Sequence, residues 1–258
     1  MIAGPRGSGN GRKTRDRIGA ASGAMAGNSR QVESNQTGPH RALGARVARH
    51  LREPWRKPVA AHNGPALEAL AARRAADPRP LVLDSFCGTG ASTRTLAARH
   101  PECLVVGIDK SAARLAKHGE ADDDYLLLRA DCEAVWQVLV REGARLAAHY
   151  LLYPNPWPKA AQLQRRVHGH PAFPLLPALG GSLELRSNWR IYVEEFGIAL
   201  HLAGVRGTVS AVPAETPLTP FEAKYRASGH VLWRCRAQAG SAVPRPANAL
   251  PSHAEPEE

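Results

Sequence analysis

Short apolar runs alternate with helical patterns along most of this chain, from residue 65 onward. Buried strands are predicted at residues 80–86, 103–110, 124–131, 148–154, 181–189, 207–215 and 230–237. Helical patterns lie before, between and after the first five of these runs, at residues 65–75, 92–100, 111–119, 133–143 and 190–204. Strand–helix alternation at this spacing is typical of an α/β fold with a doubly wound, mostly parallel sheet of Rossmann-like architecture.

A central domain is predicted at residues 41–237, with a tail on either side. Residues 1–40 are rich in Gly, Ser, Asn and Arg, which predicts a disordered basic tail, and the Pro/Ala-rich residues 238–258 predict a second one. An N-terminal helical extension is predicted just after residue 40, because one face collects three apolar residues, Leu43, Val47 and Leu51. Its arginines either lie in solvent or follow the phosphates of a nucleic acid.

The positive charge is concentrated at the N-terminal end. Residues 1–58 hold 12 lysines and arginines against 3 acids, which gives +9 of the total formal charge of +11. This balance favours a polyanionic partner. The four cysteines form no CxxC pair, so a reduced, cytoplasmic protein is expected. No apolar stretch is long enough for a membrane span, and the first 40 residues lack the hydrophobic core of a secretory signal.

A glycine turn follows the first predicted strand in "LVLDSFCGTGAST". Glycines here let backbone N–H groups approach a ligand beside a helix N-terminus, although a purely structural tight turn has the same pattern. The second strand ends at Asp109, about 20 residues further on, where an acid can accept hydrogen bonds from ribose hydroxyls. The third ends at Asp131, which is placed to bind an adenine amino group. The alternative role of both aspartates is to act as N-caps of the following helices.

The first strand ends in an acid followed by a GxG turn, and each of the next two strands ends in an aspartate. This is the layout of an S-adenosylmethionine site. The residues predicted to contact this cofactor are Asp84, Gly88, Gly90, Asp109, Lys110, Asp131, Cys132 and Asn155. Cys87 lies inside the turn and is expected to be a small buried residue. No metal site is predicted, because His168 and His170 flank a glycine in what reads as a solvated loop.

The fourth strand leads into "YPNPWPKAAQLQRR", a loop that contains neither a histidine nor an acid. Asn155 stands at the carboxyl end of the strand, where open α/β sheets place reacting groups. Trp157 offers a stacking surface, and the loop's cations are candidate phosphate contacts. Two later segments are expected beside the same pocket, "RSNWRIYVEE" with Asn188 and "TPLTPFEAKYRASGH" with Thr219. In the first of these, Trp189 and Tyr192 are either pocket or ordinary core residues.

Together these segments resemble the bacterial tRNA (guanine-N7)-methyltransferase family over roughly residues 33–236. Its "(F/Y)PDPW-K…H…RR", "TDW…Y" and "TKFE…R…G" motifs correspond in order and comparable spacing to "YPNPWPKAAQLQRR", "SNWRIYVEE" and "TPFEAKYRASGH". The chain departs from the family at four motif positions, where the family has Asp, His, Asp and Lys: Asn155, Gln162, Asn188 and Pro220. The resemblance implies a divergent class I methyltransferase that acts on tRNA.

Methylation of guanine N7 suits a loop without a general base, because N7 carries a lone pair and no proton. The resemblance places Asn155 between cofactor and base as the catalytic residue. The residues implied to position the RNA are Lys159, Arg165, Arg166, Asn188, Thr219, Phe221 and Glu222. Glu222 is alternatively a helix-capping residue. Loss of one oriented carboxylate, as at Asn155, would cost roughly 2–4 kcal/mol in the transition state.

Two other functions fit the same residues. The first is methylation of another nucleobase position or another substrate, since "NPW" partly resembles the Asn-Pro-Pro-aromatic motif of amino-methylating enzymes. The second is a catalytically inactive RNA-binding relative, which the two Asp-to-Asn differences suggest. The glycine turn and its aspartates argue against a pure binding protein, because binding RNA requires no cofactor site.

Overall fold

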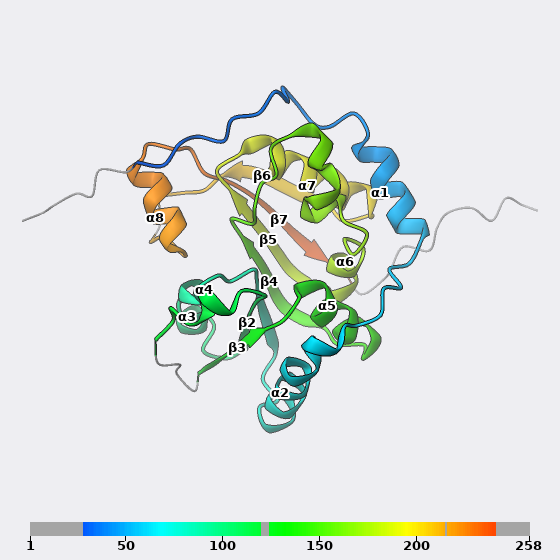
Figure 1. Cartoon of the computed structure of the whole chain (residues 1–258), viewed down its shortest axis with the longest axis vertical. Coiled ribbons are helices and arrows are strands. Elements are labelled where there is room, and N and C mark those ends of the chain that lie inside the picture. The colour runs from blue at the N-terminus through cyan, green and yellow to red at the C-terminus, as the bar shows by residue number, and fades with distance from the viewer. Residues whose placement is uncertain (1–27, 120–123, 215, 241–258) are drawn as a thin grey trace, which may run out of the picture.

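The computed structural model describes residues 28–119, 124–214 and 216–240, and these form a seven-stranded sheet in the order β3-β2-β1-β4-β5-β7-β6 (Figure 1). The strands are β1 Leu81–Ser85, β2 Leu104–Asp109, β3 Tyr125–Arg129, β4 Leu146–Leu152, β5 Gly181–Ser187, β6 Gly207–Ala211 and β7 Trp233–Ala239. β1 to β5 pair in parallel, and β7 lies antiparallel between β5 and β6. The predicted doubly wound, mostly parallel α/β sheet is confirmed.

Helices cover both faces of the sheet. They are α1 Leu43–Arg52, α2 Gly64–Ala76, α3 Ala91–Arg99, α4 Ala112–Leu115, α5 Cys132–Arg141, α6 Leu175–Leu179, α7 Arg190–Leu202 and α8 Pro220–Ala227, with 3₁₀ turns at Ala61–Asn63, Ala160–Arg165 and Val167–Gly169. Because strand side chains alternate between faces, Leu81 and Leu83 of β1 join the larger core cluster, which includes α5 and α7. Val82 points the other way and packs in a smaller cluster with Leu96 of α3.

Helix α4 is shorter than the helix predicted at residues 111–119. It begins at the N-cap Ser111, whose side chain accepts a hydrogen bond from the backbone of Arg114, and it ends at Leu115. His118 then bonds the Thr89 carbonyl at 2.7 Å and the Tyr125 hydroxyl at 2.6 Å. Tertiary contacts of this histidine therefore replace the last helical turn.

Residues 28–40, which we call the N-terminal strap, differ from the disordered tail expected there. The strap runs along the domain from the end of α8 to the start of α1 (Figure 1). Polar contacts hold it, including a 2.7 Å bond from the Ser34 hydroxyl to the Pro158 carbonyl. The rest of the expected N-terminal tail, residues 1–27, and the C-terminal residues 241–258 lie outside the described residues.

Helix α1 packs on α7 through Leu43 and Val47, which are buried. Its arginines 49 and 52 are exposed. Within the described ranges, none of the helices is long and apolar enough to cross a membrane.

Candidate active site

The glycine turn between β1 and α3 is built as the sequence predicts. Gly88 and Gly90 have φ angles of 63° and 77°, in the left-handed region that glycine adopts without strain. A Cβ atom on Gly90 would lie 2.7 Å from Nδ1 of His118, so this position has no room for a side chain. A Cβ atom on Gly88 would meet nothing within 4 Å. The backbone at Gly88 is therefore open to a ligand.

Asp84 supports the turn from beneath. Its carboxylate is fully buried and accepts hydrogen bonds from the hydroxyls of Ser92 at 2.6 Å and Thr93 at 2.8 Å, in the first turn of α3. Burial raises the pKa of this carboxyl to about 6. Oδ1 is buried with no partner among the described residues. Asp84, which was predicted to contact the cofactor, is therefore buried and holds the first turn of α3, the helix that follows the glycine turn.

Asp109 joins the turn to the end of β2. One carboxylate oxygen accepts from the backbone N–H of Gly88 at 3.0 Å, and the other accepts from that of Ser111 at 2.7 Å. Arg114 also pairs with it at 3.0 Å. Asp109 does not cap α4, because Ser111 does. Its neighbour Lys110 is exposed.

Asp131 occupies the end of β3 and is the most open of the three aspartates, with 39% of its side chain exposed. No side-chain capping bond to α5 is present, so the N-cap interpretation fails. Instead, the backbone N–H of Asp131 donates a 2.8 Å bond to Oδ1 of Asn63. The Asp131 carboxylate lies 2.9 Å from Nε2 of His62. The adjacent Cys132 thiol points inward to the Ile108 carbonyl, and burial raises its pKa.

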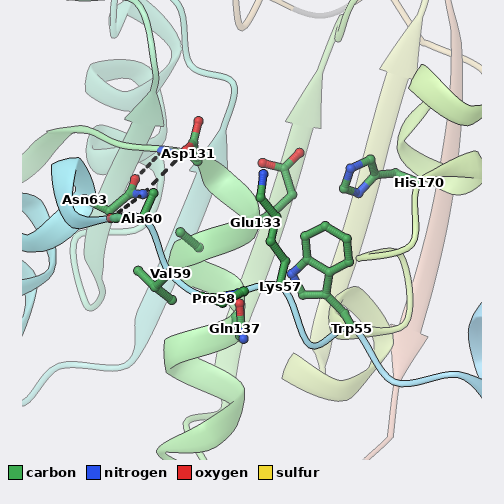
Figure 2. Close-up of a pocket in the computed structure, with 11 residues that line it drawn as sticks. Trp55, Lys57, Pro58, Val59, Ala60, Asn63, Asp131, Glu133, Gln137 and His170 are labelled. Carbon is green, nitrogen blue, oxygen red and sulfur yellow. Dashed lines mark hydrogen bonds between the residues drawn. The ribbon is translucent and has the colours of Figure 1, made fainter.

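A small cavity adjoins Asp131 between the chain before α2 and the first turns of α5 (Figure 2). Its volume is about 140 Å³, and Trp55, Lys57, Glu133 and His170 line it. Sequence analysis did not predict that residues 55–63 line this cavity. Nothing local in "EPWRKPVAAHN" indicates that this segment passes beside β3. His170 lies in a loop as predicted, but the loop is not fully solvated there: the ring is partly buried and lies 5.1 Å from that of Trp55.

These residues fit S-adenosylmethionine. The turn leaves open space at Gly88, and a buried carboxylate oxygen of Asp84 stands unpaired beneath it. Asp109 and the half-exposed Asp131 follow on the next two strands of the same edge. A nucleoside carrying hydroxyl and amino donors matches this row of acceptors.

The loop after β4 places Asn155 at the carboxyl edge of the strand next to β1. Its side chain is exposed, and its Oδ1 accepts a 3.4 Å bond from the backbone of Trp157. Tyr153 and Trp157 flank it with positive φ angles of 54° and 46°, which are strained for such residues. The guanidinium of Arg165 lies 4.7 Å over the Trp157 ring. Lys159 and Arg165 are exposed cations on the same loop.

Arg166 corrects the sequence prediction of a phosphate contact. It is fully buried, its Nη1 pairs with Glu195 at 2.6 Å, and its guanidinium lies 4.8 Å over the Trp189 ring. His168 was expected in a solvated loop, but it too is buried and bonds Glu195 at 2.8 Å. Burial works against ionisation of Glu195, yet the bonds and charges of His168 and Arg166 lower its pKa to about 2. This cluster belongs to the interior.

Three segments that are distant in sequence meet beside Asn155. The ring of Tyr153 lies 5.6 Å from that of Tyr225 in α8. Asn188, at the end of β5, contacts Nδ1 of His230 at 3.3 Å, and His230 stacks on Tyr225 at 5.4 Å. Sequence reasoning missed both Tyr225 and His230. Trp189 and Tyr192 are buried, as core residues would be.

The segment around α8 contains two further corrections. The Thr219 hydroxyl accepts a 2.9 Å bond from the backbone of Glu222, so it caps α8. Glu222 is fully buried and bonds Nη1 of Arg186 at 3.0 and 3.1 Å, which leaves it closed to a substrate. By contrast, Phe221 is 56% exposed, and Lys224 is exposed as well. Thr219 and Glu222 therefore hold α8 in place through these internal bonds.

Comparison with known proteins gives a consistent set of matches. A family model described as a putative methyltransferase matches residues 78–235. The tRNA (guanine-N(7)-)-methyltransferase of Chromohalobacter salexigens is 32% identical over 208 residues, which cover 73% of this chain and 82% of that protein. The enzyme of the same name from Sodalis glossinidius is 33% identical over 169 residues, which cover 60% and 70%.

Two solved structures share the fold. The 16S rRNA methyltransferase KamB superposes with a TM-score of 0.51 at 19% identity, covering 67% of this chain and 94% of that one. A structure described as an antibiotic-related methyltransferase gives a TM-score of 0.50 at 14% identity, covering 66% and 93%.

Proposed function

Because this chain belongs to the methyltransferase family of these relatives, as a divergent member of the tRNA (guanine-N7)-methyltransferases, we propose that it methylates N7 of a guanine in tRNA. It is an S-adenosylmethionine-dependent methyltransferase. The cytoplasm is the proposed location, where tRNA is the polyanion that suits the basic N-terminal end.

The observation that carries the proposal is the convergence of the three motif loops. Tyr153, Asn188 and α8 meet through the Tyr153–Tyr225 and Asn188–His230 contacts, at the edge where β4 adjoins β1. The glycine turn opens on that same edge. An acceptor held by these loops would therefore face a methyl donor held by the turn.

S-adenosylmethionine, when bound, supplies a methyl group on a positively charged sulfur. The protein has no proton to remove, because guanine N7 is an unprotonated acceptor. This agrees with the loop from Tyr153 to Arg166, which offers neither histidine nor acid. Its task is alignment, and rigid loop geometry around Asn155 is what alignment requires. We assign the carbonyl of Asn155 as the polar group that contacts the base.

The residues proposed to bind the RNA are either exposed or buried. Lys159 and Arg165 are exposed and suit phosphate contacts, while Phe221 is exposed and suits stacking on a base. Arg166 is buried and paired, so it acts through the loop rather than on the RNA. We assign the exposed arginines of α1, Arg49 and Arg52, to nonspecific phosphate contacts.

The test is methylation of unmodified bulk tRNA with labelled S-adenosylmethionine, followed by nucleoside digestion and mass spectrometry. The expected product is 7-methylguanosine. A different methylated nucleoside would assign the chain to another nucleobase position. Cofactor binding without any methylated nucleoside would identify an inactive RNA-binding relative.

A further inference from the structure

The N-terminal strap contacts the segment that follows α8, the loop after β4, and helix α7, which follows the Asn188 segment. At one end, Ser29 accepts a 3.0 Å bond from His230 and donates a 3.1 Å bond to Ser228, next to α8. In the middle, the Ser34 hydroxyl bonds Pro158 of the loop after β4. At the other end the strap reaches Glu195, in the helix after β5. One continuous segment thus connects all three.

Glu195 joins the strap to the loop of residues 153–166, which we call the catalytic loop. Its Oε1 accepts from the Gln36 side chain at 2.6 Å and from the His40 backbone at 2.8 Å, both in the strap. Its Oε2 accepts from Arg166 at 2.6 Å and His168 at 2.8 Å, both in the segment that closes the loop. The carboxylate is fully buried, so these four donors replace water.

Arg166 connects Glu195 to the backbone of the catalytic loop. Its Nε donates to the Trp157 carbonyl at 3.2 Å, and its Nη2 donates to the Lys159 carbonyl at 3.4 Å. Nη2 also donates to Oε1 of Gln36 at 3.0 Å. Gln36 therefore bonds both members of the buried ion pair. The backbone two residues beyond Asn155 is fixed by a group that the strap itself holds in place.

We propose that Glu195 is a positioning residue for the acceptor side of the site, and that Gln36 of the strap completes it. Together they hold the loop of residues 153–166 in the conformation that presents Asn155 and Trp157 to the guanine. Gln36 is thereby the strap residue that supports the RNA-binding site, through its bonds to Glu195 and Arg166. This inference rests on the proposed function, because it concerns the acceptor of that reaction.

The decisive variant is Gln36→Glu, which places a second carboxylate against Glu195. Asn35→Asp is the matched control, because it adds the same charge one residue away, on an exposed side chain for which the described residues provide no hydrogen bond. Gln36→Glu is expected to lower kcat/KM for tRNA by about tenfold or more, since small misplacements of an aligned acceptor are costly. Asn35→Asp should stay within about threefold of wild type.

A reciprocal variant separates positioning from a general loss of structure. Gln36→Glu/Glu195→Gln leaves one carboxylate between the two positions, and Arg166 keeps a charged partner. It should recover most of the kcat/KM that Gln36→Glu loses. The dissociation constant for S-adenosylmethionine should be the same in all these variants, because the contacts lie on the acceptor side. Equal kcat/KM for Gln36→Glu and Asn35→Asp, or no recovery in the double variant, would overturn the inference.

A second readout does not depend on catalysis. Trypsin cleavage after Lys159 and Arg165, followed by mass spectrometry, reports how well the loop is held. Gln36→Glu should be cleaved there faster than Asn35→Asp. If the wild type methylates no tRNA, the proposed function fails, while faster cleavage in Gln36→Glu would still support the joint between strap and loop. Equal cleavage rates would contradict that joint whether or not the enzyme is active.

Discussion

Arg165 and Arg166 are neighbours in the sequence, but they occupy opposite environments. Arg165 is exposed with its guanidinium over Trp157, whereas Arg166 is buried between Glu195 and Trp189. A run of two cations contains no pattern that separates an inward from an outward side chain. The sequence therefore predicted two phosphate contacts, whereas the structure leaves only Arg165 exposed.

This difference gives a paired prediction. Arg165→Ala should reduce the slope of log K for RNA against log salt by about 1, because one phosphate contact is lost. Arg166→Ala should instead lower the free energy of unfolding by about 3–5 kcal/mol, because it leaves the charge of Glu195 buried and unpaired. Filter binding at several salt concentrations and urea unfolding measure the two effects. The assignment is wrong if Arg166→Ala unfolds like the wild type and shares the altered salt slope.

Asn155 allows a gain of activity to be predicted. The methylated base is cationic, so a carboxylate in place of the amide should stabilise the developing charge. Asn155→Asp is expected to raise kcat on tRNA by about thirtyfold to several hundredfold, which corresponds to roughly 2–4 kcal/mol. Asn35→Asp, which adds an equal charge outside the loop, is the control. An unchanged or lower kcat for Asn155→Asp would show that this position does not face the reacting base.

Asp109 is predicted to be necessary for cofactor affinity. Asp109→Asn keeps one acceptor but loses the charge and one of the two backbone bonds to Gly88 and Ser111. Binding of S-adenosylmethionine should weaken by about tenfold or more, because a hydrogen bond to a charged group contributes roughly 1.5–3 kcal/mol. Titration calorimetry measures this, with the exposed Asp124→Asn as control. Affinity equal to that of the control would remove Asp109 from the cofactor site.

At the scale of elements, local patterns predicted the strands well and the connections less well. The residues of β1 and β2 are buried throughout, and their apolar runs marked them in the sequence. α8 lacks so clear a signal, because it has eight residues and its most buried side chain is the charged Glu222. The strap has no local signal at all. Its partners at Pro158 and Glu195 lie more than a hundred residues away, so only the folded chain reveals them.

The cap of α8 yields a prediction at this scale. Thr219→Ala removes the acceptor for the Glu222 backbone and should lower the free energy of unfolding by about 1 kcal/mol, whereas Thr219→Ser retains the hydroxyl and should stay close to wild type. Urea unfolding of the three proteins gives the comparison. If Thr219→Ala loses tRNA methylation with unchanged stability, Thr219 acts on the substrate instead.

For the molecule as a whole, buried titratable groups predict how stability depends on pH. The bonds of Glu195 lower its pKa from 4.5 to about 2 despite burial, so its contribution is present above pH 4.5 and is lost as the pH falls toward 2. Burial lowers the pKa of His149 from 6.5 to about 3, which gives a similar loss below pH 6.5. Asp84 has the opposite effect. Burial raises its pKa to about 6, so its contribution to the free energy of unfolding is fully present below about pH 4 and is lost as the pH rises through 6.

The expected result is a net fall in the free energy of unfolding as the pH is lowered from 6.5 to 3. The Glu195→Gln variant should be less stable than wild type at pH 7, and the gap should narrow below pH 4.5. Chemical unfolding monitored by fluorescence at each pH tests this. A gap that stays constant over the whole range would mean that the charge of Glu195 does not contribute to stability.

The sheet order brings the glycine turn, the loop after β4 and the end of β5 to one carboxyl edge, where we propose that guanine N7 is methylated. The most direct measurement compares two transcripts of the same tRNA, one with guanosine and one with 7-deazaguanosine, in which carbon replaces N7. Labelled S-adenosylmethionine should transfer methyl groups to the first, recovered as 7-methylguanosine, and none to the second. Equal labelling of both transcripts, or a labelled nucleoside other than 7-methylguanosine, would contradict the account.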